Sequence, residues 1–546
     1  MRSVRDLQER LPGRRNPSGI TMPRITIDGR EVEVDAGATI LDAARKLGIE
    51  IPTMCYLRGH DATTSCMVCV VKVVGGNGLV PACGTPVRDG MQVESTSEEV
   101  FDARRSALEL LLSDHVGDCV GPCVVGCPAH MNIPQMIRQI AAGQLADAIA
   151  TVKRDIALPA VLGRICPAPC ENVCRRAQHD QAVSICLLKR HVADVDLSSE
   201  VPYAPKCAAP KGKRVAIIGA GPAGLAAAYY LQQEGFGCVV VDEHDEPGGM
   251  LRYGVPESEL PHDILKAEIA QIEKLGVRFR LGIRVGQAIS MEEVRKQFDA
   301  VFVAVGELKE GDAEALRFAA ADKIKVDGTT YATDLPGVFA GGDAVRRRRM
   351  TVRAVADGKE AARSIAQYLS GQEVVGPEKR FNSRMGKLTE SELSIFLQSA
   401  SSEPRTKPFG IASTFSVDEA RAESLRCLRC DCRKPDACLL RRYAQAYGAR
   451  QNRYKADRRL FVQRTQHPDV IYEPGKCIDC GICIQIASEA GEALGLTFVG
   501  RGFDVRVAVP FDGTLADGLR VAAERCVAAC PTGALAFKDG KEPPSA

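Results

Sequence analysis

The chain has 546 residues, which is too many for one ordinary domain and suggests three to five. Lysine and arginine together number 71 and aspartate and glutamate 69, so no net field favours nucleic acid or an anionic membrane as a partner. The 22 cysteines fall largely in CxxC and CxxxC groups. In so long a chain these groups favour metal ligation in a reducing compartment over a framework of disulfides.

Two segments bear on location. The N-terminal segment MRSVRDLQERLPGRR is charged and lacks the apolar stretch of a secretory signal, so we expect a cytoplasmic protein. The longest uncharged run, 215–233, is broken by three glycines and a proline. It predicts a strand, a turn and a helix, so no membrane span is expected.

Residues 23–100 predict a small β-rich domain with one helix. The stretch RITIDGREVEVDAG alternates as a hairpin does, with its turn at Asp28-Gly29, and ATILDAARKLGI has helical spacing. Four thiolates converging from a loop and a later strand can hold a two-iron cluster. The candidate ligands are Cys55, Cys66, Cys69 and Cys83. The segment resembles the ferredoxin-like N-terminal domain of the large iron–sulfur subunit of complex I and of iron-only hydrogenases, which implies a β-grasp domain with one [2Fe-2S] cluster.

Residues 101–205 have helical periodicity interrupted by Cys-Pro groups. The phrase LGRICPAPCENVCRR, with an upstream CxxxCP, resembles the N-terminal domain of the glutamate synthase small subunit and of dihydropyrimidine dehydrogenase. That resemblance implies two [4Fe-4S] clusters whose ligands are exchanged between the two motifs. The candidate ligands are His115, Cys119, Cys123, Cys127, Cys166, Cys170, Cys174 and Cys186.

The first motif departs from the family, because it has three cysteines where the family has four. His115 lies in LLSDHVGDC, which looks like the start of the histidine-ligated cluster of complex I, and imidazole can replace thiolate on iron. An ordinary surface or capping histidine is the alternative. Cys186 is either the eighth ligand or a buried helix cysteine. The family has a glutamate or glutamine near Lys189, and lysine is a poor iron ligand.

Residues 206–370 predict an α/β domain. The apolar runs VAIIGAG, VVVDE, AVFVAVG and GVFAGGDA suit a parallel sheet that is buried on both faces. Glycines between a strand and a helix let the backbone approach a pyrophosphate, and an acid at the end of the next strand can accept a hydrogen bond from a ribose hydroxyl. With GGML and the distant GVFAGGDA, the pattern resembles the FAD domain of glutamate synthase small subunits. The resemblance implies FAD; a flavin-free Rossmann scaffold is the alternative. The candidate residues are Gly219, Gly221, Pro222, Ala223, Gly224, Asp242, Gly249, Met250, Gly342 and Asp343.

Relatives of this type insert an NADPH-binding domain after the AVG strand. Here about 30 residues separate Gly306 from GVFAGGDA, too few for a complete second nucleotide domain. We therefore expect the nicotinamide domain to be absent. The run Arg346 to Arg349 could bind a phosphate, face a partner's acidic surface, or be a solvated loop.

Residues 371–425 are polar and predict a linker, and residues 426–546 return to cysteine groups. The phrase CLRCDCRKPDAC places four thiols within twelve residues, which suits one zinc ion or one [4Fe-4S] cluster. The candidate ligands here are Cys427, Cys430, Cys432 and Cys438.

The last group resembles the two-cluster ferredoxin modules of formate dehydrogenases and hydrogenases. A CxxCxxC triad and a remote Cys-Pro form one ferredoxin-type site. Alanine stands at positions 487 and 523, where such a module has further ligands, so we expect one cluster instead of two. The ligands would be Cys477, Cys480, Cys483 and Cys530, with Cys526 as a substitute.

These segments predict a multidomain α/β plus α+β protein: a ferredoxin-like β-grasp domain, a helical iron–sulfur domain, a Rossmann-type FAD domain and a ferredoxin-like C-terminal module. The resemblances imply FAD, one [2Fe-2S] cluster and three to four [4Fe-4S] clusters. Zinc is the alternative to a [4Fe-4S] cluster at Cys427–Cys438. No catalytic acid, base or nucleophile is expected.

By analogy, the resemblances imply an electron-transfer subunit of a hetero-oligomer. Its partners would be other redox subunits, such as an NADH/flavin subunit, a molybdenum or tungsten enzyme or a hydrogenase. One alternative is a self-contained NAD(P)H:acceptor oxidoreductase or bifurcating subunit. The other is a non-catalytic scaffold with structural metals.

Overall fold

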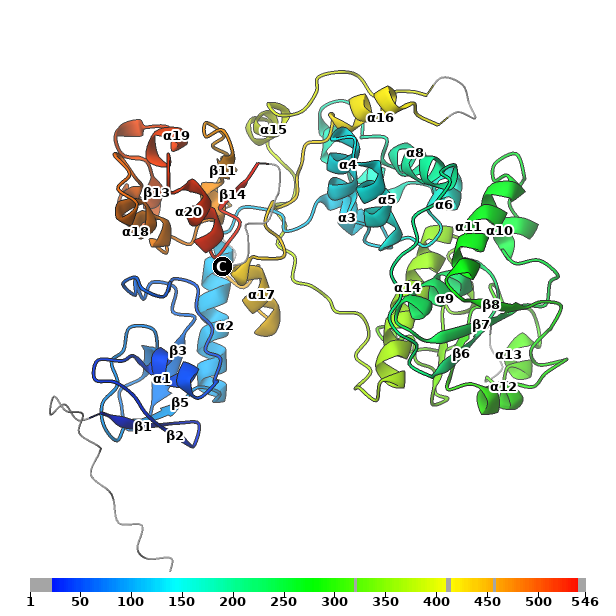
Figure 1. The fold of residues 1–546 in the computed structure, drawn as a ribbon, viewed down its shortest axis with the longest axis horizontal. Coiled ribbons are helices and arrows are strands. Elements are labelled where there is room, and N and C mark those ends of the chain that lie inside the picture. Colours follow the sequence, from blue (N-terminus) through cyan, green and yellow to red (C-terminus); the bar gives the residue numbers. More distant parts are fainter. Residues whose placement is uncertain (1–21, 319–321, 409–413, 455–457, 539–546) are drawn as a thin grey trace, which may run out of the picture. The chain divides into compact units, whose positions relative to one another are not determined.

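The computed structural model describes residues 22–318, 322–408, 414–454 and 458–538. The N-terminal segment that carries the expectation about a secretory signal lies outside these residues. The chain divides into two compact units (Figure 1). Unit 1 contains residues 1–120, 380–395 and 431–546, and unit 2 contains residues 121–379 and 396–430. Most of unit 2 is therefore inserted into the sequence of unit 1, and the domain boundaries expected above stay a prediction.

The first part of unit 1 is a mixed five-stranded sheet in the order β2-β1-β5-β3-β4. Its strands are β1 (Arg24–Ile27), β2 (Arg30–Glu33), β3 (Val70–Val73), β4 (Leu79–Pro81) and β5 (Gln92–Glu94). The predicted hairpin is present, because β1 pairs antiparallel with β2 around Asp28-Gly29, both of which have positive φ. Helix α1 (Ile40–Lys46) begins at a capping box between Thr39 and Asp42, which satisfies its first backbone donors.

The rest of unit 1 is helical with two small two-stranded sheets. Its helices are α2 (Glu98–Ser113), α17 (Leu439–Ala446), α18 (Ile482–Glu489), α19 (Leu515–Gly518) and α20 (Ala523–Ala529). Its strands are β11 (Val470–Tyr472), β12 (Thr497–Val499), β13 (Arg506–Ala508) and β14 (Leu535–Phe537), with β11 antiparallel to β14 and β12 to β13. One apolar core joins Met54, Leu108, Val470 and Ile486, so the N-terminal and C-terminal parts of this unit pack as one body.

Unit 2 begins with short helices around an apolar core. They are α3 (Pro122–Gly126), α4 (Ile133–Ala141), α5 (Leu145–Lys153), α6 (Pro159–Ile165), α7 (Pro169–Asn172) and α8 (Ile185–Leu197). Proline stands in the first turn of four of them, where its missing N–H costs no hydrogen bond. Helix α16 (Val417–Ser424) from the end of the unit packs on α4 and α8, and α15 (Glu390–Leu397) lies where the chain passes back from unit 1.

The remainder of unit 2 is a five-stranded sheet in the order β10-β9-β6-β7-β8, in which every neighbouring pair is parallel. Its strands are β6 (Arg214–Ile218), β7 (Gly237–Val241), β8 (Arg278–Arg280), β9 (Ala300–Val303) and β10 (Val338–Ala340). Its helices are α9 (Pro222–Gln233), α10 (Met250–Tyr253), α11 (His262–Lys274), α12 (Met291–Gln297), α13 (Asp312–Ala315) and α14 (Thr351–Leu369). The apolar runs are buried strands, which confirms the predicted parallel α/β sheet.

Helices α9 and α14 pack closely on one another. Gly358 of α14 makes this possible, because a Cβ there would lie 2.2 Å from the Ala223 carbonyl oxygen. Between β9 and β10 the described residues form a single short helix, α13.

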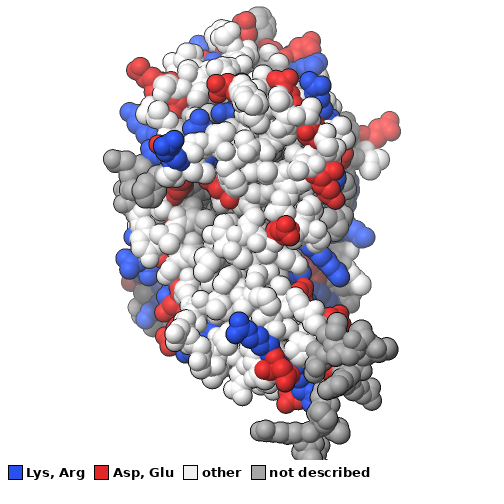
Figure 2. All heavy atoms as spheres, turned by 90° about the vertical axis from the view of Figure 1, so that its left-hand side faces the viewer, with Lys and Arg blue, Asp and Glu red and all other residues white. Residues whose placement is uncertain are grey.

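Charged side chains are interspersed on the face of the molecule shown in Figure 2, and neither sign forms a continuous patch there. None of the helices in the described ranges combines the length and apolar character that crossing a membrane requires.

Candidate metal centres and nucleotide site

The glycine loop between β6 and α9 is shaped for close backbone approach. Gly219 has a φ of +109°, and a Cβ there would lie 2.3 Å from the Ala304 carbonyl oxygen. A Cβ on Gly224 would lie 1.9 Å from the Gly219 carbonyl oxygen. A Cβ on Gly221 would instead meet nothing within 4 Å, so the space beside the first turn of α9 is open. A phosphate could approach the backbone N–H groups there.

Asp242, at the end of β7, fixes this loop. It is buried, and its Oδ2 accepts a hydrogen bond from the Ala220 N–H at 2.6 Å. Its Oδ1 accepts one from the His244 N–H at 2.9 Å. Two carboxylate oxygens offer about four lone pairs, so Asp242 retains capacity for a ribose hydroxyl.

The other predicted nucleotide residues lie around the same loop. A Cβ on Gly249 would lie 2.8 Å from the Gly221 Cα, so the Gly248-Gly249 turn closes against the loop. Pro222 and Ala223 form the first turn of α9, and Met250 is exposed.

Gly342 and Asp343 follow β10. The Gly342 N–H donates to Oδ2 of the buried Asp357 at 3.1 Å, and Asp343 Oδ1 accepts from the N–H of Arg348 at 3.0 Å. Asp343 thus holds the start of the arginine run. Sequence reasoning missed Asp357, because it lies within α14 and carries no motif.

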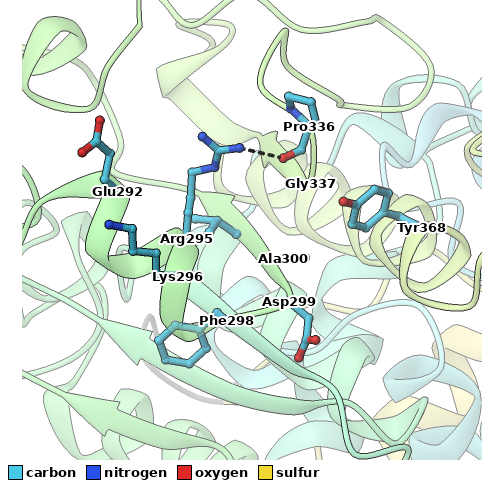
Figure 3. Close-up of a pocket in the computed structure, with 10 residues that line it drawn as sticks. Glu292, Arg295, Lys296, Phe298, Asp299, Ala300, Pro336, Gly337 and Tyr368 are labelled. Atoms are coloured by element: carbon cyan, nitrogen blue, oxygen red, sulfur yellow. Dashed lines mark hydrogen bonds between the residues drawn. The ribbon is translucent and has the colours of Figure 1, made fainter.

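A separate cavity of about 460 Å³ lies at the amino ends of strands β9 and β10, at the opposite end of the strands from the glycine loop (Figure 3). Its lining includes Ala300 at the start of β9, Arg295 of α12 and Tyr368 of α14. The Arg295 guanidinium donates to the Pro336 carbonyl oxygen at 3.3 Å. Nucleotides bind at the carboxyl ends of parallel strands, so this cavity at the amino ends is not the predicted site.

The four cysteines of the N-terminal domain come together. All four are buried, and the Sγ atoms of Cys69 and Cys83 are 3.4 Å apart. The hydrogen bond with Cys83 lowers the pKa of the Cys69 thiol to about 7. Cys55 contacts both Cys66 and Cys83 through side-chain hydrogen bonds. The donor set is four thiols, which suits a two-iron cluster.

A second group of thiols lies in unit 2 at the ends of short helices. A hydrogen bond with Cys186 lowers the pKa of the Cys166 thiol to about 7. Burial, and then the charge of the nearby Cys127, raise the pKa of the Cys170 thiol to about 12. Cys186 therefore lies with the candidate ligands and is not an isolated helix cysteine.

Lys189 is buried beside this second group. Burial lowers the pKa of its ammonium, but nearby thiolates, Cys186 foremost, raise it by more. A buried cation here offsets the negative charge of gathered thiolates.

The structure divides the cysteines between 427 and 438. Cys427 and Cys430 belong to unit 2, where they line one cavity with Cys123 and Cys174. Cys432 and Cys438 belong to unit 1. A single metal site formed by Cys427, Cys430, Cys432 and Cys438 stays a prediction.

Cys432 and Cys438 lie near Cys119 within unit 1. Burial, and then the charges of Cys432 and Cys119, raise the pKa of Cys438 to about 12. The Ser383 N–H donates to the Cys119 Sγ at 3.3 Å. The imidazole of His115, four residues before Cys119, has its pKa lowered to about 4 by burial and by Lys476. It is therefore neutral at pH 7 and has the form that can ligate a metal.

The last thiol group lies around the start of α18. Burial, and then nearby charges that include Cys530, raise the pKa of the Cys477, Cys480 and Cys483 thiols. Cys526 is buried beside them, and its thiol donates to the Cys483 carbonyl oxygen at 3.6 Å. Ala487 is buried in α18, and α20 begins at Ala523.

Within the described ranges, no three His, Cys, Asp or Glu side chains form a group that could hold a single metal ion. The fold and the gathered thiols define a class: an iron–sulfur protein with a Rossmann-like nucleotide-binding domain.

Three family models agree with this class. Residues 21–98 match a 2Fe-2S iron–sulfur cluster binding domain, and residues 113–201 match the dihydropyrimidine dehydrogenase domain II, 4Fe-4S cluster. Residues 217–267 match an NAD(P)-binding Rossmann-like domain.

Known relatives are parts of oxidoreductases. The chain is 41% identical over 189 residues to the NADPH-Fe(3+) oxidoreductase subunit beta of Geobacter sulfurreducens, covering 34% of this chain and 28% of that protein. It is 40% identical over 206 residues to the NADP(+)-dependent formate dehydrogenase subunit beta of Moorella thermoacetica, covering 34% and 29%. It is 35% identical over 199 residues to the glutamate synthase [NADPH] small chain of Bacillus subtilis, covering 36% and 40%.

The expected resemblance to glutamate synthase small subunits and dihydropyrimidine dehydrogenase is thereby confirmed. The matches span less than half the length of these relatives.

Proposed function

We propose that the chain is an electron-transfer component of a larger oxidoreductase complex. It would carry electrons through one [2Fe-2S] cluster, several [4Fe-4S] clusters and FAD, between a partner catalytic subunit and another carrier. The observation that carries the proposal is the gathering of thiols into separate groups in a chain that also holds a glycine loop shaped for a dinucleotide.

The nucleotide loop fits FAD by its shape and donors. The open space at Gly221 would take the pyrophosphate, the first turn of α9 would donate backbone N–H groups, and Asp242 would accept from the ribose. Gly342 and Asp343 would lie along the chain that joins the phosphates to the flavin. When bound, flavin can exchange one or two electrons, which lets it join single-electron clusters to a two-electron substrate.

Three of the thiol groups fit [4Fe-4S] clusters directly. We assign one to Cys127, Cys166, Cys170 and Cys186, and one to Cys477, Cys480, Cys483 and Cys530. A third would have Cys119, Cys432, Cys438 and His115 as ligands. His115 is included because it lies four residues before Cys119 in a segment that packs against residues 475 and 476. The Val116 N–H donates to the Gly475 carbonyl oxygen at 2.6 Å, and a Cβ on Gly117 would lie 2.4 Å from the Lys476 side chain.

The partners would be other redox subunits in a hetero-oligomer. The names of two relatives support a hetero-oligomer, because both relatives are beta subunits of oxidoreductases. Thiolate ligation of this extent also favours a reducing cytoplasmic compartment.

A second candidate function is oxidation of NADH or NADPH by the chain itself. The match of residues 217–267 to an NAD(P)-binding domain favours it. If the chain oxidises these nucleotides, anaerobic addition of NADH or NADPH to the purified chain will bleach its flavin absorbance within seconds. If the chain is a relay, its flavin will stay oxidised with either nucleotide and will bleach with dithionite.

The proposal is tested by the metal and flavin content of the protein purified without oxygen. We expect one FAD per chain and about 14 to 18 irons with matching sulfide, from one two-iron and three to four four-iron clusters. Iron and sulfide near zero with several zinc ions per chain would instead indicate a scaffold with structural metals.

A further inference from the structure

Four cysteines from opposite ends of unit 2 line one cavity. Cys123 lies in α3 and Cys174 follows α7, whereas Cys427 and Cys430 come from the segment after α16. The same cavity is lined by the apolar side chains of Ile137 and Ile185. Four thiols around a largely apolar cavity are the ligand set and the surroundings that a [4Fe-4S] cluster requires.

We propose that Cys123, Cys174, Cys427 and Cys430 form one split [4Fe-4S] site, in which each half of the ligand set comes from a different part of the chain. The proposal rests on the iron–sulfur function proposed above. It also completes the helical domain, whose first motif has three cysteines instead of four.

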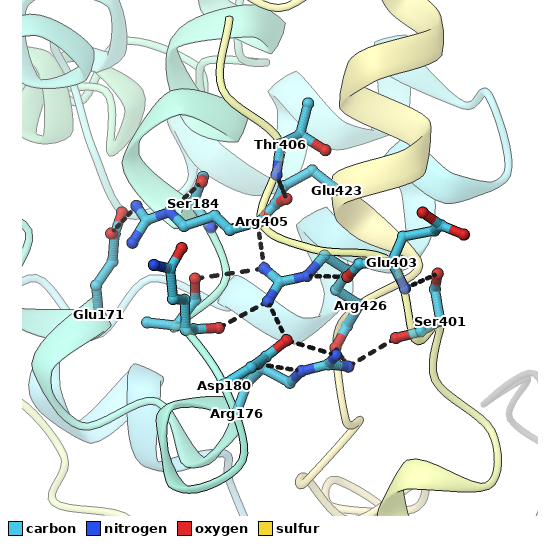
Figure 4. Close-up of polar contacts among 12 residues, drawn as sticks. Glu171, Arg176, Asp180, Ser184, Ser401, Glu403, Arg405, Thr406, Glu423 and Arg426 are labelled. Carbon is cyan, nitrogen blue, oxygen red and sulfur yellow. Dashed lines mark hydrogen bonds and ion pairs between the residues drawn. The ribbon is translucent and has the colours of Figure 1, made fainter.

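A buried ionic network holds the two halves together (Figure 4). Arg176 is fully buried two residues after Cys174, and its Nε and Nη2 donate to the carboxylate of Asp180 at 2.6 and 2.8 Å. Its Nη1 donates to the carbonyl oxygens of Ser401 at 2.8 Å and Arg426 at 3.3 Å. Arg176 therefore ties the segment that contains Cys174 to the returning segment.

Arg426 makes the reciprocal contacts from the other side. It is fully buried next to Cys427, and its Nη2 donates to Asp180 Oδ2 at 2.9 Å and to the Gln181 carbonyl oxygen at 2.8 Å. Its Nη1 donates to Glu423 Oε1 at 2.9 Å. Both guanidinium groups thus share the carboxylate of Asp180.

Two carboxylates extend the network to the next group of thiols. The buried Glu423 accepts from the Ser184 N–H at 2.7 Å and from the Thr406 N–H at 2.7 Å. Arg405 pairs with Glu171 at 2.6 Å, and Glu171 accepts from the Cys186 N–H at 2.9 Å. Backbone beside ligands of both unit 2 sites is therefore fixed by the same set of charges.

The charges in this network balance. Arg176 and Arg426 are offset by Asp180 and Glu423, and Arg405 by Glu171. Buried ion pairs contribute little net stability compared with apolar packing, but they fix one arrangement because a broken pair leaves a buried charge. Arg176 and Arg426 are thus positioning residues for the split site.

The test is the loss of iron from single and double cysteine variants of the full chain, purified without oxygen. Cys123→Ala and Cys430→Ala should each lose about four irons and the same signal in the electron paramagnetic resonance spectrum of the reduced protein. The double variant should also lose about four, because both residues ligate one cluster. Cys430→Ala with Cys432→Ala should lose about eight, because these two neighbours belong to different clusters. Cys207→Ala is the control and should retain all of its iron.

The opposite pattern would overturn the inference. If Cys430→Ala with Cys432→Ala lost about four irons and Cys123→Ala with Cys430→Ala lost about eight, residues 427–438 would form one contiguous site. Loss of zinc without iron in Cys430→Ala would also overturn it. Absence of iron from the unmodified chain would contradict the proposed function itself, so the two failures are distinguishable.

The positioning role has its own test. Arg426→Gln should lose the paramagnetic resonance signal of the split site, which is the same signal that Cys430→Ala loses. The signals of the other clusters should remain. Arg421→Gln, on the exposed side of α16, should have the spectrum of the unmodified chain. An unchanged spectrum and reduction potential in Arg426→Gln would show that the arginine does not position the ligands.

Discussion

Two glycines of the nucleotide loop have different surroundings although they are three residues apart. A Cβ on Gly224 would lie 1.9 Å from backbone, whereas one on Gly221 would project into open space. Gly224→Ala should therefore lower the melting temperature of the protein, since overpacking costs about 1–3 kcal/mol. Gly221→Ala should leave the melting temperature of the flavin-free protein unchanged but reduce the FAD retained on purification. Full retention of FAD by Gly221→Ala would show that the phosphates do not lie there.

Glu268 is a buried acid whose protonation should affect stability. Its carboxylate accepts from the N–H groups of Ala160 at 2.9 Å and Val161 at 2.8 Å, and Lys153 and Arg164 are the cations near it. Burial raises its pKa to about 7, above that of an unfolded glutamate. Between about pH 4.5 and 7, the folded state therefore binds more protons at this residue than the unfolded state does.

The sign of this effect follows from linkage. The contribution of Glu268 to stability is fully present below about pH 4.5 and is lost as the pH rises through about 7. Glu268→Gln cannot titrate, so the melting temperature of the unmodified chain should fall relative to this variant between pH 5 and 7.5. A constant difference between the two proteins across that range would contradict the assignment.

Among the elements, α14 and α9 depend on one glycine contact. Gly358→Val should force these helices apart, because a Cβ at this position would lie 2.2 Å from the Ala223 carbonyl oxygen. We expect a lower melting temperature and loss of FAD, since Ala223 belongs to the first turn of α9. Arg363→Val introduces the same side chain on the exposed side of α14 and should change neither quantity. Equal effects of the two substitutions would argue against a specific contact.

Several elements follow from local sequence. The hairpin at Asp28-Gly29 and the strands of the parallel sheet are predicted by alternation and by apolar runs, because these patterns reflect burial of one or both faces. The thiols at 55–83 also come together as their spacing predicts. In these cases the residues that determine the structure lie within one segment.

The grouping of Cys427 and Cys430 could not be predicted in the same way. In the sequence they stand beside Cys432, and only in the folded chain do they line the same cavity as Cys123 and Cys174. We propose that this arrangement depends on Arg176, Arg426 and Asp180, which carry no recognisable motif. Long-range polar networks leave no periodic signal in a sequence.

For the whole molecule, the main feature is the insertion of unit 2 into unit 1. The insertion begins after Val120, next to Cys119, and ends before Asp431, next to Cys432. The ligands that we propose for one unit 1 site, Cys119 and Cys432 among them, are thus separated in sequence by unit 2. In the proposed assignment, Cys430 and Cys432, which are two residues apart, are therefore ligands of different clusters.

The central claim is that the chain stores and passes electrons through several clusters and a flavin. The most direct measurement is an anaerobic reductive titration of the purified chain, followed by electron paramagnetic resonance. We expect an uptake of about six or seven electrons per chain, one for each of four or five clusters and two for FAD, with several distinct cluster signals. Uptake of two electrons or fewer, with no cluster signal, would contradict it.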